Sequence, residues 1–212
     1  MTAISSQLLV DAVLCVEHMT FNERERLADE VHAQQPNLFF SVLALQRCGA
    51  TLEQMEVVLN LLFVFYSAMK MSDKVWPVIS EDVQERGLKR INARVRFIEG
   101  LTPQQQHKAT ADAIADHTEK QILAYAFGKL GEHGLLGIKT EAEKMIMLAA
   151  LNLVECIALT APKRKGRARC SRTEHETRSL QWSVISSTRE NPQHLAHVSI
   201  QHACRVRNNA VC

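Results

Sequence analysis

The chain has 212 residues, of which 46% are hydrophobic and only 5% aromatic, with 8 glycines and 5 prolines. This composition favours helices and argues against a β-rich fold, which needs β-branched and aromatic residues with frequent turn glycines. Residues 1–161 hold 15 Lys and Arg against 20 Asp and Glu, a net charge of −5, whereas residues 162–212 hold 10 against 3, a net charge of +7. An acidic body therefore precedes a basic end, and the two are considered separately.

The cysteines and the apolar runs indicate the cellular compartment. Six cysteines occur without a C-x-x-C pair, and Cys15, Cys48 and Cys156 lie in apolar helical patterns, so a secreted disulfide framework is not expected. The first residues lack a basic n-region, and Asp11 interrupts the apolar run from Leu8 to Val16. The longest near-apolar runs are shorter than the ~20 residues of a membrane-spanning helix. We therefore expect a cytoplasmic protein without a membrane span.

Three helices are predicted before residue 50. The first covers residues 5–18, with apolar residues recurring at intervals of three and four. The second begins at the capping box of Thr20 and Glu23 and is strongly polar. The third, over residues 38–48, is apolar almost throughout, and Gly49 ends it.

The helix predicted over residues 51–71 is the centre of the chain. Thr51 and Gln54 form a capping box at its start. Between residues 57 and 69 only Asn60 and Ser67 are polar, and a helix that is apolar on all sides must be buried on all sides. We expect residues 38–48 and 145–159 to pack against it and Phe63 to be buried.

Three further helices are predicted in the second half of the body. Ser80 is the expected N-cap of a helix over residues 81–99. Thr102 and Pro103 begin a sixth helix, with a capping box completed by Gln105, and the apolar pattern extends it to about Gly128. A glycine-rich connection follows, and a fourth capping box, of Thr140 and Glu143, opens a seventh helix over residues 141–159.

These elements predict an all-α fold, a bundle of six or seven helices around the central helix. The helical domain covers residues 1–160. Residues 161–212 begin with the cationic run KRKGRAR and show no sustained period of two or 3.6. We predict that this basic segment is mostly disordered.

No sequence motif indicates catalysis or cofactor binding. The glycine-rich stretch GKLGEHGLLGIKT lacks the G-x-x-x-x-G-K-[ST] spacing of a phosphate loop, and the chain contains no G-x-S-x-G. A di-iron bundle needs Glu-x-x-His, which is absent, and Asp112, Asp116 and His117 have the spacing of a solvated helix face. The histidines near the C-terminus fit a zinc site poorly. We expect no catalytic, cofactor or metal site.

Asn60, Asn152 and Glu155 are polar residues on apolar helices. They meet one another in the interior, or Glu155 is an acid with a perturbed pKa. Alternatively, such residues lie at a helix edge or fix the packing register.

Four basic residues lie close together on the helix over residues 81–99: Arg86, Lys89, Arg90 and Arg94. We call these four residues the basic ridge. Three of them recur every four residues and so share a face, which suits contact with nucleic-acid phosphates or an acidic partner. Acidic neighbours such as Asp82 and Glu85 also fit an ordinary salt-bridged surface.

The function predicted from these patterns is non-enzymatic. Three helices are apolar nearly all round, and a single bundle of this size buries few such helices completely. The sequence therefore predicts a helical interaction module that forms a homo-oligomer or binds a protein partner. The first alternative is a nucleic-acid-associated regulator that uses the basic ridge and the basic C-terminal segment, and a small enzyme with a buried polar site ranks third.

Overall fold

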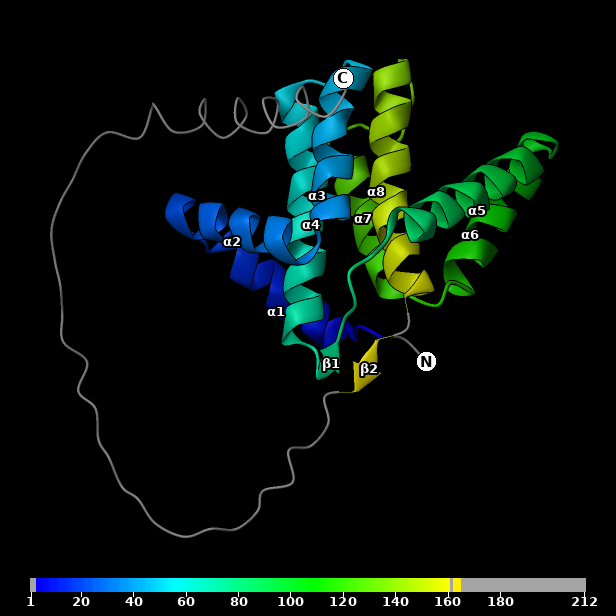
Figure 1. Cartoon of the computed structure of the whole chain (residues 1–212). Helices are drawn as coiled ribbons and strands as arrows, with labels where there is room; N and C mark the ends of the chain where they lie inside the picture. Colours follow the sequence, from blue (N-terminus) through cyan, green and yellow to red (C-terminus); the bar gives the residue numbers. More distant parts are fainter. Residues whose placement is uncertain (1–2, 161, 165–212) are drawn as a thin grey trace, which may run out of the picture. The chain divides into compact units, whose positions relative to one another are not determined.

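The computed structural model describes residues 3–160 and 162–164, and Figure 1 shows how their elements are arranged. These residues form eight α-helices, one 3-10 helix (η1) and two short strands. In chain order the elements are α1 (Ser6–Glu17), α2 (Phe21–Gln34), α3 (Pro36–Leu43), η1 (Ala44–Cys48), α4 (Leu52–Met71), β1 (Lys74–Val75), α5 (Glu81–Glu99), α6 (Pro103–Ala115), α7 (Lys120–Glu132), α8 (Glu141–Leu159) and β2 (Lys163–Arg164). The predicted all-α fold is confirmed.

Local sequence signals determine where the helices begin. All four predicted capping boxes are present, at the starts of α2, α4, α6 and α8. At α4 the Thr51 hydroxyl accepts the Gln54 N–H at 3.2 Å, and the Gln54 side chain accepts the Thr51 N–H at 3.1 Å. Gly49 ends η1 at a φ of 83°, where a side chain would strain the backbone.

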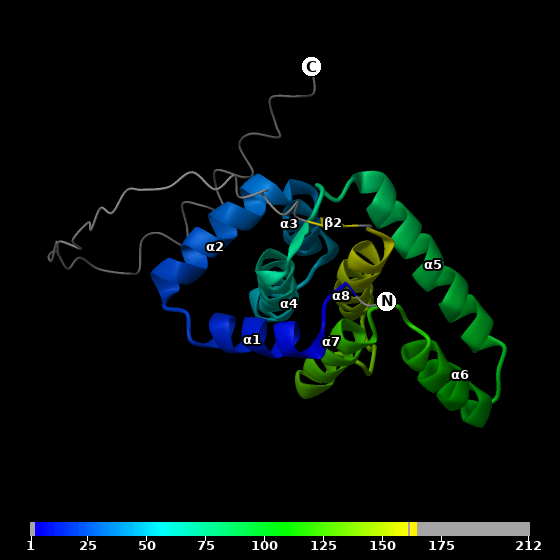
Figure 2. The ribbon, with the colours of Figure 1, turned by 90° about the horizontal axis from the view of Figure 1, so that it is seen from below.

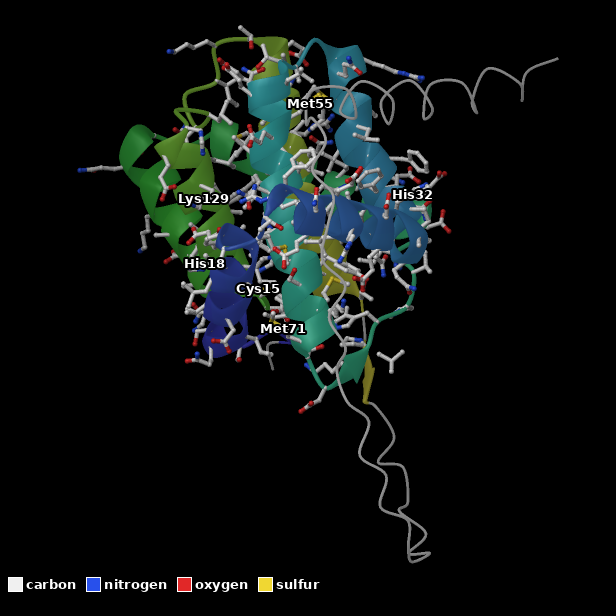
Figure 3. The ribbon with its side chains drawn as sticks, turned by 90° about the vertical axis from the view of Figure 1, so that its left-hand side faces the viewer. Cys15, His18, His32, Met55, Met71 and Lys129 are labelled. Carbon is white, nitrogen blue, oxygen red and sulfur yellow. The ribbon has the colours of Figure 1, made fainter. Side chains whose placement is uncertain are left out.

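The helix α4 lies at the centre of the domain, as predicted. Phe63 is only 6% exposed, and the helix is buried on every side from Leu61 to Met69. The predicted neighbours α3 and α8 both pack against it. The sequence did not predict the most extensive contact of α4, which is with α1. Figure 3, which labels Cys15 on α1 and Met71 at the end of α4, shows α1 alongside the C-terminal half of α4.

By length and composition, α4 is the one helix in the described part of the chain that is apolar enough to cross a membrane. Its most apolar stretch is 67% buried within the protein. The helix therefore has the surroundings of a core element in this structure.

The predicted sixth helix is wrong in its extent, because two helices occupy its place. The helix α6 ends at Ala115, α7 begins at Lys120, and α7 continues through Gly128 and Gly131 to Glu132. The break between them turns His117 and Glu119 inward, and both are buried. The stabilisation from these buried contacts outweighs the preference of the segment for one continuous helix.

The helices α5 and α6 form a hairpin, which we call the arm, and it stands apart from the core around α4. Figures 1 and 2 show the arm on one side of the other helices, joined to them through α8 and α7. None of the fully buried residues of the main apolar core comes from described arm residues. Val83 and Ile114 contact that core while only partly buried. The fully buried part of the main core is therefore built by residues outside the arm, and the arm packs against it through α8.

A short antiparallel ladder joins β1 to β2, with Lys74 opposite Arg164 and Val75 opposite Lys163. Two residues that we assigned to the basic C-terminal segment thus pair with the helical domain. The rest of that segment, and with it the prediction of disorder over residues 161–212, lies outside the described residues.

Candidate functional site

The segment that leads into the arm, just before α5, is held by the junction between α2 and α3. The Gln35 side chain donates to the Pro77 carbonyl at 3.0 Å and accepts the Ile79 N–H at 2.9 Å. Asn37 donates to the Ile79 carbonyl at 2.9 Å. Ser80 then accepts the Val83 N–H at 3.4 Å at the start of α5. These bonds hold the segment before α5 and set where the arm leaves the body.

Glu155 on α8 is the centre of the contact between the arm and the body. Its side chain is 2% exposed. Arg94 of α5 forms an ion pair with Oε1, and Arg90 Nη1 lies 3.4 Å from Oε2. His117 Nε2 lies 3.3 Å from Oε1. The buried Glu155 carboxylate is therefore in contact with two guanidinium groups from the arm and with the ring of His117, which lies at the break between α6 and α7.

These neighbours set the charge state of Glu155. Burial raises its pKa, whereas the hydrogen bond with His117 and the charges of Arg94 and Arg90 lower it. The lowering effects prevail, so the pKa of this carboxyl lies below its ordinary value of 4.5. Glu155 is therefore ionised at neutral pH, and its predicted perturbed pKa takes the form of a lowered pKa.

The backbone at the break between α6 and α7 fixes the tautomer of His117. The Glu119 N–H donates to His117 Nδ1 at 3.1 Å, so the ring hydrogen lies on Nε2 and points to Glu155. The Glu119 carboxylate accepts the N–H groups of Ala3 and Ile4, the latter at 3.3 Å. The same break therefore ties the arm to the segment before α1.

Close packing between α5 and α8 depends on Gly87. A Cβ at this position would lie 2.3 Å from Asn152 Oδ1 and 3.2 Å from Glu155 Cβ. Three buried side-chain polar atoms in the described part of the chain have no hydrogen-bond partner, namely Gln84 Nε2, Asn152 Oδ1 and Glu155 Oε2, and all three lie on α5 or α8. The last is near Arg90 without the alignment of a hydrogen bond. The contact between α5 and α8 is therefore closely packed, but three of its buried polar atoms lack hydrogen bonds.

The basic ridge is divided by this arrangement. Arg90 and Arg94 turn toward Glu155, although their side chains remain 45% and 36% exposed. Lys89 pairs with Glu85, four residues before it, at 2.7 Å, as on the salt-bridged surface considered above, and Arg86 is exposed. The use of these residues for nucleic acid or an acidic partner stays a prediction.

Asn60 does not join Asn152 and Glu155. It lines a separate hollow between α4 and α7, together with Val57, Leu61, Tyr125, Lys129 and His133. The hollow is partly open to solvent and offers only about 20 Å³ to a water-sized molecule, far below the ~300–1,000 Å³ of small-molecule sites. Sequence reasoning also missed His117 as a partner of Glu155, since we read it as part of a solvated face. The one available signal was the run Asp116-His117-Thr118, three poor helix formers in succession.

Neither reactive thiols nor metal ligands gather in the described residues. Cys156 is buried, and burial raises the pKa of its thiol to about 12, with the charge of Glu155 adding to the effect; it is a small apolar side chain at neutral pH. Cys15 and Cys48 are exposed. Within residues 3–160 and 162–164, no three His, Cys, Asp or Glu side chains are placed to hold a metal ion.

Comparison of the chain with protein-family models, with curated proteins and with solved structures finds no match. The fold and the contact between arm and body are therefore the basis for the functional proposal.

Proposed function

We propose that this chain is a non-enzymatic helical interaction module that associates through the arm, with a second copy or with another protein. One observation supports the proposal most directly, which is a two-helix hairpin whose described residues contribute no fully buried side chain to the main core. The apolar surplus expected from the sequence does not support it, because α1, α3, α7 and α8 cover α4 within one chain. The proposal therefore depends on the arm and on the apolar surface that the arm exposes.

The arm buries little of its own apolar surface. Ile91 is the one fully buried large hydrophobic side chain that the structure describes on α5 or α6. Val95 is 38% exposed, and Phe97 is 66% exposed. Burying a phenylalanine side chain contributes about 1.5–3 kcal/mol of free energy. In the isolated chain Phe97 is largely exposed, so a partner that covers it would add this free energy to association.

Sedimentation velocity over a range of protein concentrations tests self-association. We expect the wild-type mass to rise with concentration and a Phe97→Ser variant to remain monomeric. Leu52→Ser is the matched control, because Leu52 is 65% exposed and begins α4, away from the arm; it should behave as wild type.

A second measurement covers association with a different protein. A photo-crosslinking residue placed at position 97 should give specific cross-linked products in cells, and the same residue at position 52 should not. A monomeric wild-type chain together with equal cross-linking at both positions would contradict the proposed function.

Nucleic-acid binding is the second candidate. It is favoured by the exposure of Arg86 and by the partly exposed side chains of Arg90 and Arg94. Because Arg90 also pairs with buried Glu155, its substitution would disturb the fold, so Arg86→Gln is the cleaner test. It should weaken binding to all sequences alike and reduce the slope of affinity against salt by about one. Lys120→Gln, at an exposed position on α7, should leave both unchanged.

A further inference from the structure

We propose that two copies of this chain pair through the outer face of α5, with the two helices antiparallel about a two-fold axis. This inference rests on the proposed function and names the surface and the partner for it. The inner face of α5 is occupied, since Gly87 and Ile91 are buried and Arg94 reaches Glu155. The outer face is the part of the helix that remains available to a second molecule.

The outer face follows from helical spacing and from exposure. Residues three and four apart share a side of a helix, and one such row on α5 is exposed at every position: Asp82, Glu85, Lys89, Asn92, Ala93 and Arg96. Charge is distributed unevenly along this row. The first two turns carry Asp82 and Glu85 beside exposed Arg86, and the last turn carries Arg96. This face therefore has a net negative charge in its first two turns and a basic side chain in its last turn.

This distribution is complementary to itself when the helix is reversed. Asp82 and Arg96 are 14 positions apart, or about 21 Å along a helix that rises 1.5 Å per residue. In an antiparallel pair Asp82 of one copy faces the partner's Arg96, and the two-fold axis repeats the contact at the other end. Phe97, at the edge of the row, then lies beside the turn of the partner that contains half-buried Val83.

The middle of the pair brings the two copies of Lys89 near the axis. Their repulsion is reduced because each Lys89 is already paired with its own Glu85 at 2.7 Å. Nucleic acid fits this face less well than a second copy does, because its phosphates would be repelled by Asp82 and Glu85. A second copy uses both the acidic and the basic end.

The contact is small. A pairing of two helices of 19 residues buries less than the ~800 Å² per partner of a standard interface. We therefore expect a dimer with micromolar or weaker affinity. Because exposed charge pairs are screened by salt, the affinity should fall as the salt concentration rises.

Exchange of charges between the two ends provides the test, carried out on the full chain by sedimentation velocity. Asp82→Lys alone and Arg96→Glu alone should each weaken dimerisation by tenfold or more. An equimolar mixture of the two variants should dimerise again, because both end contacts in the mixed pair are between opposite charges. The double variant should also dimerise with itself.

Two controls separate this effect from changes in net charge or folding. Glu53→Lys and Lys120→Glu make the same charge changes at exposed positions outside the arm, and they should leave dimerisation unchanged. Circular dichroism melting confirms that each variant is folded. If the wild type dimerises but neither single variant weakens it, or the mixture fails to restore it, the α5 surface is wrong while the proposed function stands. A wild-type chain that is monomeric at every concentration overturns the surface and self-association together.

Discussion

Glu155 owes its buried charge to residues that are far from it in the chain. Arg94, Arg90 and His117 precede it by 61, 65 and 38 positions respectively. The sequence shows that Glu155 is a polar residue on an apolar helix, which is a local property. Its partners depend on how α5 and the break at His117 fold back onto α8, so no local pattern identifies them. Cys156 illustrates the opposite case, because its burial follows directly from the apolar pattern around it.

Removing the charge of Glu155 should destabilise the protein. In Glu155→Gln the two arginines lose a carboxylate; a fully buried pair broken in this way costs about 3–5 kcal/mol, and the partial exposure of both arginines reduces the expected loss to about 2 kcal/mol. Urea unfolding measures it. Glu141→Gln, which removes an exposed partner of Lys144 on the same helix, should cost less than about 0.5 kcal/mol.

The stability difference between wild type and Glu155→Gln should also depend on pH. The pKa of Glu155 is lower in the folded state than its ordinary value of 4.5, so its stabilisation is complete above that value and is lost as the pH falls through the folded pKa. The difference in unfolding free energy between wild type and Glu155→Gln should stay constant above about pH 5 and shrink below about pH 4.5. A difference that grows on acidification would show that the pKa of Glu155 is raised.

At the scale of the elements, signals within one helix were predictable and contacts between helices were not. The four capping boxes each involve residues three apart, and all four are present. The break between α6 and α7 depends on residues that are far away in the sequence, because the Glu119 carboxylate accepts the N–H groups of Ala3 and Ile4. The sequence pattern continues through this segment, so a single helix was predicted in error.

Gly87 shows how packing reverses the effect expected from helix propensity. In an exposed helix Gly→Ala gains up to about 1 kcal/mol. At Gly87 the added Cβ would lie 2.3 Å from Asn152 Oδ1, so Gly87→Ala should destabilise the protein by about 1–3 kcal/mol. Gly128→Ala, on α7 with no atom within 4 Å of the new Cβ, should stabilise it slightly in thermal melting. Equal stabilisation by both substitutions would mean that α5 does not pack closely on α8.

At the scale of the whole molecule, the core is built around α4. Phe63→Ala should cost about 3–5 kcal/mol, a large part of the 5–15 kcal/mol of a typical domain. Phe97→Ala is the matched control, because Phe97 is 66% exposed, and it should cost less than about 0.5 kcal/mol. Denaturant unfolding distinguishes the two, and a loss below about 1 kcal/mol at Phe63 would place the core elsewhere.

A second prediction at this scale concerns the C-terminal segment. A chain that ends at Ala161 loses the pairing of β2 with β1, which is a ladder of two residues on each strand. Because a hydrogen bond contributes about 1 kcal/mol net, the shortened chain should keep its helical circular dichroism and its cooperative melting. Loss of folding would show that the helical domain depends on residues beyond 161.

The central claim is that a core around α4, to which described arm residues contribute no fully buried side chain, carries an arm through which the chain associates. Hydrogen exchange at low and at high protein concentration tests both parts in one measurement. At low concentration the amides of α5 and α6 should exchange at a lower opening free energy than those of α4 and α8, because the arm gives no fully buried residue to the main core. At high concentration protection should increase in α5 and stay unchanged in α4. Equal protection of arm and core at low concentration, or an increase confined to helices outside the arm, would contradict the account.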